Sequence, residues 1–370
     1  MIVWLLMYAV LFLACFGCVF YLSRKLRKHQ LLWRHSRRKP TLLSYAIVLI
    51  PLAVLWVWLG FINMIIILLH LTLFWMLSEL LQKAVERKKP LRHNYAGVLA
   101  LLLTAAYLCT AGVMAFHVRQ VDYTITTEKE VGSLRVALIA DSHMGTTFGG
   151  TGFAKQLQKI EAQNPDVLVI AGDYVDEDTT RKEMEDACRA LGQMHTTYGI
   201  YYVLGNHDWG NYTNSREFSG EDLVAALEEN GVTVLRDEAA VIDGRFTILG
   251  REDASEELYS GKARENMETL MEKAEDGTYT IVLDHQPRDY AAQAAAGADL
   301  VLSGHTHGGQ FFPMAQLMDG LHVGGNDLVY GHKQVDNTDF IVTSGISDWA
   351  LIFRTGYGSE FVIVNILEKR

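Results

Sequence analysis

Four long apolar stretches occupy the first third of the chain. Each is close to the roughly 20 residues that a helix needs to cross the hydrocarbon core of a bilayer. They lie at about residues 1–22, 41–60, 61–81 and 95–118. The second and third stretches adjoin, so we expect a tight turn near Gly60 that joins them as a helical hairpin. The pattern predicts a transmembrane region of four helices over residues 1–118.

Beyond this region, short apolar runs alternate with helical patterns. Several runs are almost continuously Val, Ile and Leu, as expected of strands whose two faces are both covered. Strands are predicted at 134–140, 167–171, 200–204, 246–249, 280–283, 300–302, 340–343 and 360–366, and helices at 153–162, 181–194 and 221–230. This alternation predicts α/β layers around central sheets over residues 134–370. Residues 119–133 are predicted to form a linker that contains an edge strand.

Charge divides the chain at the same point and predicts its orientation. Residues 1–118 carry thirteen Lys and Arg and only two acids, Glu79 and Glu86. The basic residues gather in two loops, at 23–40 and 82–93. With four spans both loops fall on one side, and the positive-inside rule assigns that side to the cytoplasm. We therefore expect a multi-pass protein of the cell membrane whose domain after residue 118 is extracytoplasmic.

The rest of the chain is strongly acidic. It contains 20 basic and 41 acidic residues, a formal net charge of −21. A field of this sign repels the phosphates of nucleic acids, so no nucleic-acid partner is expected. Carboxylates that serve as cation ligands also contribute to such an excess of acidic residues.

Polar residues capable of binding metal follow five of the predicted strands. The blocks are Asp141–His143, Gly172–Asp176, Gly205–Asp208, Asp284–His285 and Gly304–His307. Sites in open α/β sheets form outside the carboxyl ends of strands, where all five blocks fall. Imidazole, carboxylate and amide donors without thiolate suit Mn, Fe or Zn. Two such ions sharing one carboxylate form a clamp about 3.5–4 Å wide for phosphoryl transfer.

In this order, the blocks DSH, GDYVD, GNHD, DH and GHTHGG resemble the calcineurin-like metallophosphoesterase superfamily. The forms SGHTHGGQ and GDYVD look most like its bacterial membrane-associated phosphodiesterase branch. The resemblance covers about residues 134–367. It implies an α/β (α+β) domain, a two-sheet β-sandwich flanked by helices, with a dinuclear metal site between the strand ends.

The resemblance also implies a role for each motif residue. Seven side chains carry over as ligands of two ions: Asp141, His143 and His307 for the first, Asn206, His285 and His305 for the second, and Asp173 as the bridge. His207 would contact the scissile phosphate or protonate the leaving oxygen, and Asp208 would orient His207. The implied reaction is attack on phosphorus by a metal-bridging hydroxide, with His207 as general acid.

We therefore expect dimetal-dependent hydrolysis of a phosphate ester, specifically a phosphodiester at or near the outer face of the cytoplasmic membrane. One alternative is a phosphomonoesterase or pyrophosphatase acting on a lipid carrier. Another is a non-catalytic membrane sensor or assembly factor, although the presence of both His207 and Asp208 favours an enzyme. The apolar stretch Gln310–Met314, followed by Leu317 and Met318, either packs beneath the site or contacts lipid. A lipid-linked substrate and membrane lipids are thus candidate partners.

Overall fold

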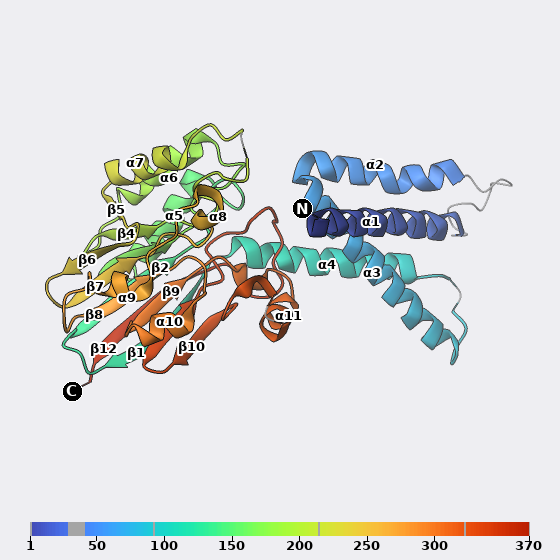
Figure 1. Cartoon of the computed structure of the whole chain (residues 1–370). Helices are drawn as coiled ribbons and strands as arrows, with labels where there is room; N and C mark the ends of the chain where they lie inside the picture. The colour runs from blue at the N-terminus through green and yellow to red at the C-terminus, as the bar shows by residue number, and fades with distance from the viewer. Residues whose placement is uncertain (1, 29–40, 92, 214, 322, 370) are drawn as a thin grey trace. The chain divides into compact units, whose positions relative to one another are not determined.

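The computed structural model describes residues 2–28, 41–91, 93–213, 215–321 and 323–369 (Figure 1). The chain divides into two compact units, Met1–Ala111 and Gly112–Arg370. Part of the first basic loop, with Arg34, Arg37, Arg38 and Lys39, lies outside the described residues, as does Arg92 of the second loop.

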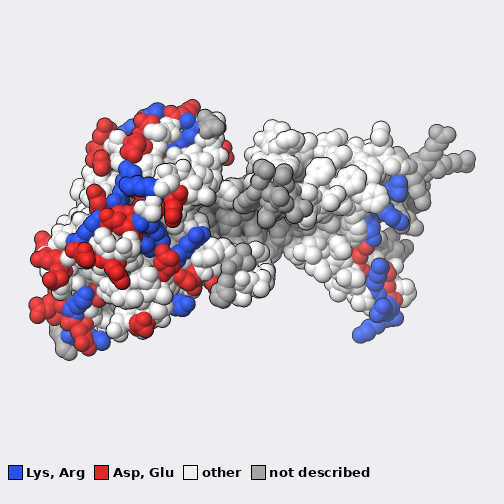
Figure 2. All heavy atoms as spheres, in the orientation of Figure 1, with Lys and Arg blue, Asp and Glu red and all other residues white. Residues whose placement is uncertain are grey.

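The first unit is built from long apolar helices. These are α1 (Ile2–Lys28), α2 (Thr41–Leu59), α3 (Phe61–Glu86) and α4 (Ala96–Phe116). All four are long and apolar enough to cross a membrane, as predicted. Gly60 has a φ of 83° and separates α2 from α3. The visible face of this unit is almost uncharged apart from a group of basic and a few acidic side chains near one end (Figure 2).

The second unit contains two six-stranded sheets. The order in the first sheet is β1-β12-β2-β3-β4-β5, and in the second β10-β11-β9-β8-β7-β6. The strands of the first sheet are β1 (Arg119–Thr127), β2 (Ser133–Ile139), β3 (Val167–Ala171), β4 (Ile200–Val203), β5 (Val232–Val234) and β12 (Glu360–Glu368). Those of the second are β6 (Glu238–Ile242), β7 (Phe246–Gly250), β8 (Tyr279–Leu283), β9 (Leu300–Ser303), β10 (Gly331–Val335) and β11 (Thr338–Val342).

Alternate residues of each central strand face two different cores. In β2, Val136 and Leu138 belong to the core between the sheets, together with Ile281 of β8. Ala137 and Ile139 point to the other face and pack with residues of the helices. This double coverage explains why the strands read as continuous apolar runs.

Helices cover the outer face of each sheet. α5 (Gly150–Glu161), α6 (Arg181–Leu191) and α7 (Gly220–Glu229) pack on the first sheet. α9 (Met267–Met271) and α10 (Tyr290–Ala295) pack on the second, and the short helix α8 (Glu256–Ser260) precedes them. A 3-10 turn (His307–Gly309), α11 (Met314–Leu321) and a second 3-10 turn (Val323–Gly325) follow β9. The predicted sandwich flanked by helices is confirmed.

Candidate metal centre

The five polar blocks meet because their strands run parallel. β2, β3 and β4 are parallel neighbours in one sheet, and β8 and β9 are parallel neighbours in the other. Their carboxyl ends therefore share one edge of the sandwich. Two groups of potential metal ligands form there, Asp141 with His143 and His307, and Asp173 with His285 and His305.

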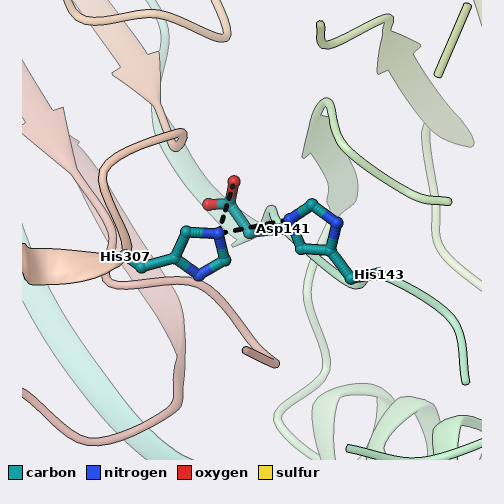
Figure 3. A group of neighbouring side chains, drawn as sticks. All are labelled: Asp141, His143 and His307. Atoms are coloured by element: carbon teal, nitrogen blue, oxygen red, sulfur yellow. Dashed lines mark hydrogen bonds and ion pairs between the residues drawn. The ribbon is translucent and has the colours of Figure 1, made fainter. Parts of the chain in front are cut away.

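The side chains of the first group point toward a common centre (Figure 3). The Nε2 atoms of His143 and His307 lie 3.2 Å apart. Asp141 Oδ1 lies 3.8 Å from His307 Nε2. Burial lowers the pKa of His143 to about 3 and that of His307 well below its usual value. Two neutral imidazoles that face each other beside a carboxylate fit a shared cation, because both can then donate a lone pair.

The second group has one imidazole whose tautomer is fixed. His285 Nδ1 donates to the carbonyl oxygen of Ala171 at 2.7 Å. Its Nε2 is therefore left for a ligand bond, as in metal sites whose histidines are held by outer partners. This Nε2 lies 3.1 Å from Asp173 Oδ2 and 3.2 Å from Asn206 Oδ1. The sequence-predicted Asn206 thus joins the second group.

Asp173 lies between the two groups. Its Oδ2 is 3.1 Å from His285 Nε2 and 3.8 Å from His143 Nε2. Burial opposes ionisation of this carboxyl, but His285 and His207 hold its pKa well below the usual range. An ionised carboxylate that reaches both groups has the geometry required of a bridging ligand.

The backbone around the centre is unusual. Five of the seven predicted ligands, Asp141, His143, Asp173, His305 and His307, have positive φ values of 36–73°. Such conformations cost on the order of 1–3 kcal/mol each and concentrate at functional sites. Gly205 is required for close approach, because a Cβ there would lie 2.2 Å from Asp173 Oδ1.

Several contacts hold His207 at the edge of the centre. Its backbone N–H donates to Asp173 Oδ1 at 2.9 Å, and its ring Nδ1 lies 2.7 Å from Glu177 Oε1. Its ring centroid lies 5.3 Å from that of Trp349. Although burial disfavours the imidazolium, Asp173 and Glu177 raise the pKa of His207 to about 9. The two carboxylates thus favour the protonated form of the ring.

The hydrogen bonds of Asp208, which was expected to orient His207, go to the backbone of two loops and to a tyrosine. Its carboxylate accepts hydrogen bonds from the backbone N–H groups of Asp173 at 2.9 Å and Gly205 at 2.6 Å. The Tyr202 hydroxyl also donates to it at 2.5 Å. The side chain turns back beneath the loops after β3 and β4 and ties them together. Glu177, which the sequence analysis missed, takes the position beside His207.

Arg354 is a second residue that the motifs did not indicate. It is fully buried, and its Nε donates to Asp348 Oδ1 at 2.6 Å. Its Nη2 donates to the carbonyl oxygen of Ser347 at 2.8 Å and lies 3.4 Å from His307 Nδ1. A buried guanidinium therefore supports the loop behind one of the predicted ligands.

Comparison with known proteins agrees with this geometry. The family described as calcineurin-like phosphoesterase matches residues 134–309. A metallophosphoesterase of Aquifex aeolicus is 30% identical over 200 residues, covering 53% of this chain and 72% of that protein. One from Campylobacter jejuni is 29% identical over 279 residues, covering 74% of this chain and 70% of that protein.

A vertebrate relative is named for both a transmembrane region and a metallophosphoesterase domain. The Danio rerio transmembrane protein with metallophosphoesterase domain is 33% identical over 291 residues, covering 74% of this chain and 62% of that protein. Bacterial and eukaryotic relatives thus both appear, and together with the four apolar helices they indicate a membrane protein. The predicted family and enzyme class are confirmed. The chain belongs to the calcineurin-like metallophosphoesterases, dimetal-dependent hydrolases of phosphoric esters.

Proposed function

We propose that the centre binds two divalent transition-metal ions, Mn, Fe or Zn, and hydrolyses a phosphodiester at or near the outer face of the cytoplasmic membrane. The position of Asp173 between the two His and Asp groups is the observation that carries this proposal. The predicted ligands are Asp141, His143 and His307 for one ion, Asn206, His285 and His305 for the other, and Asp173 for both.

The side chains divide the work of the reaction. When bound, two divalent ions would acidify a water molecule and neutralise charge on the phosphoryl oxygens. His207 supplies the proton that a departing alkoxide needs, which contributes typically 10²–10⁴-fold. Glu177 accepts from His207 Nδ1 and so presents the other ring nitrogen to the leaving oxygen. Asp208 keeps the loops after β3 and β4 at a fixed separation.

The basic residues support the outer location of the catalytic domain. Arg24 and Lys25 near the end of α1, and Lys83 near the end of α3, belong to the two basic segments at 23–40 and 82–93. Both loops connect ends of neighbouring spans, and the positive-inside rule assigns such loops to the cytoplasm. One span, α4, follows the second loop and takes the chain to the opposite side before the catalytic domain begins.

The substrate class is tested by turnover of paired chromogenic esters. The full-length protein in detergent is expected to cleave bis-nitrophenyl phosphate faster than nitrophenyl phosphate. Asp173→Asn should abolish both reactions, because the bridging charge is lost. Asp243→Asn is the matched control, since Asp243 also has positive φ but lies exposed in the turn between β6 and β7. Faster cleavage of the monoester would favour the phosphomonoesterase alternative, and no turnover by metal-loaded protein would favour the sensor.

A further inference from the structure

The helix α11 presents an apolar face outward from the catalytic unit. Its exposed residues recur at three- and four-residue intervals, which places them on one face of the helix. They are Met314 (44% exposed), Leu317 (46%) and Leu321 (69%), preceded by Phe312 (65%). Residues 310–321 contain no Lys or Arg. The single acid, Asp319, accepts a hydrogen bond from the backbone of Val329 at 2.9 Å.

This helix packs against the turn that carries one of the predicted metal ligands. The turn His307–Gly309 begins with a predicted ligand and leads into the helix. A Cβ at Gly309 would lie 2.5 Å from the backbone nitrogen of Ala315, so helix and turn are in close contact. Ala315 itself is buried. The outward apolar face therefore lies at the rim of the site rather than on a remote surface.

The last turn of α4 is bound into the same unit. The carbonyl oxygens of Met114 and Ala115 accept from the N–H and the hydroxyl of Ser359, at 3.0 and 2.7 Å. Only His117 and Val118 separate α4 from β1, and Val118 lies in the core beneath the first sheet. The last residues of α4, from Gly112 on, thus belong to the catalytic unit.

A short segment connects this junction to α11. The carbonyl oxygen of Gln310 accepts from the N–H groups of Thr355 and Gly356, at 2.9 and 3.1 Å. Thr355 Oγ1 accepts from the N–H of Phe312 at 3.1 Å. From Thr355 to Ser359 the chain has four peptide steps, which span at most about 14 Å. The start of α11 is therefore near the point where α4 ends.

We infer that α11 and Phe312 form an interfacial membrane contact, with the exposed face buried at the boundary between lipid headgroups and acyl chains. The last turn of α4, a helix of membrane length, lies near the start of α11 within the catalytic unit, and the apolar side chains of the α11 face are suited to that boundary. Because the face carries no basic residue, its association is expected to be independent of anionic lipid. The consequence for the substrate rests on the proposed function: an ester with a lipid anchor would enter the metal centre from the bilayer surface.

The placement of α11 is tested with full-length protein in phosphatidylcholine vesicles. The four native cysteines are replaced, and an environment-sensitive fluorophore is attached through Leu317→Cys. Val241→Cys is the matched control, because Val241 is 47% exposed on β6. Nitroxide-labelled lipids should quench the probe at position 317 and leave the probe at 241 unaffected. Added phosphatidylglycerol should not change the result. Equal responses at the two positions would overturn the inference.

A second copy of the chain is the other occupant that this face could take. In that case the probe at 317 would become shielded as protein concentration rises in detergent, and nitroxide lipids in vesicles would not quench it. This result would also overturn the inference.

A second measurement uses protein that keeps its native cysteines. Leu317→Ser/Leu321→Ser should lower turnover of a lipid-anchored phosphodiester relative to a soluble one several-fold, whereas Val241→Ser should not. Quenching at 317 without turnover of any lipid-anchored ester would leave the interfacial helix standing and reject the proposed substrate.

Discussion

Glu177 Oε1 lies 2.7 Å from Nδ1 of His207, so Nδ1 carries a proton that it donates to this carboxylate. A carboxylate in this position does two things to an imidazole. It selects the tautomer with the proton on Nδ1, and it stabilises the doubly protonated form. A carboxylate that holds one ring nitrogen leaves the other nitrogen of the imidazole to exchange a proton with a substrate.

We predict that His207→Ala retains bound metal but loses about 10²-fold or more in turnover of an ester with an alkoxide leaving group. Nitrophenyl esters should be much less affected, because nitrophenolate departs without protonation. Steady-state rates on both substrates, with metal content measured in parallel, check this. Equal losses on the two substrates would show that His207 acts otherwise.

The pH dependence should respond to Glu177. A general acid must be protonated, so turnover of an alkoxide ester falls as pH rises through the pKa of His207. Asp173 and Glu177 raise this pKa to about 9, and removing the Glu177 charge lowers it. Glu177→Gln should therefore move the basic limb of the pH–rate profile to lower pH. The profile on a nitrophenyl ester is the control and should keep its basic limb in place.

The buried pair of Arg354 and Asp348 yields a stability prediction. Arg354→Met leaves a fully buried carboxylate without its cation, which costs about 3–5 kcal/mol. The double variant Arg354→Met/Asp348→Leu should recover much of this loss, because neither charge then remains. Thermal unfolding midpoints of the three proteins test the coupling. If the double variant loses as much stability as the two single losses added together, or more, the effect does not come from the Arg354–Asp348 pair.

Topology is accessible to cysteine labelling. In a background without native cysteines, Ser133→Cys should react with an impermeant maleimide in intact cells, because Ser133 begins β2 on the catalytic unit. Lys89→Cys, in the second basic loop, should react only after lysis. The reverse pattern would place the catalytic domain in the cytoplasm.

Much of the site could be predicted because it depends on strand ends. Parallel strands bring their carboxyl ends to one edge, so the five polar blocks were expected to meet there, and the family resemblance supplied the particular ligands. Contacts that depend on local backbone geometry were harder to predict. The sequence contains three consecutive acids, Asp176, Glu177 and Asp178, and no pattern distinguishes the one that reaches His207. The sharp turn after His207 carries Asp208 away from the ring, where a simple reading of the motif places it nearby.

Two of the strands that the sequence analysis missed, β5 and β10, lack the usual signal of a buried strand. β5 has three residues, and β10 is largely exposed at a sheet edge, with His332, Lys333 and Gln334 in its interior. Neither has the apolar run that marks a buried strand. Arg354 was missed for a different reason, since it lies 47 residues beyond His307 and only the fold brings the two together.

The metal content of the purified full-length protein is the most direct test of the central claim. Elemental analysis should find close to two transition-metal ions per chain, and a chelator should remove both the ions and the activity. Asp173→Ala should lose both ions, because its carboxylate lies between the two ligand groups, whereas Asp243→Ala should keep them. One ion or none in an active wild-type preparation, or two ions retained by Asp173→Ala, would contradict the account.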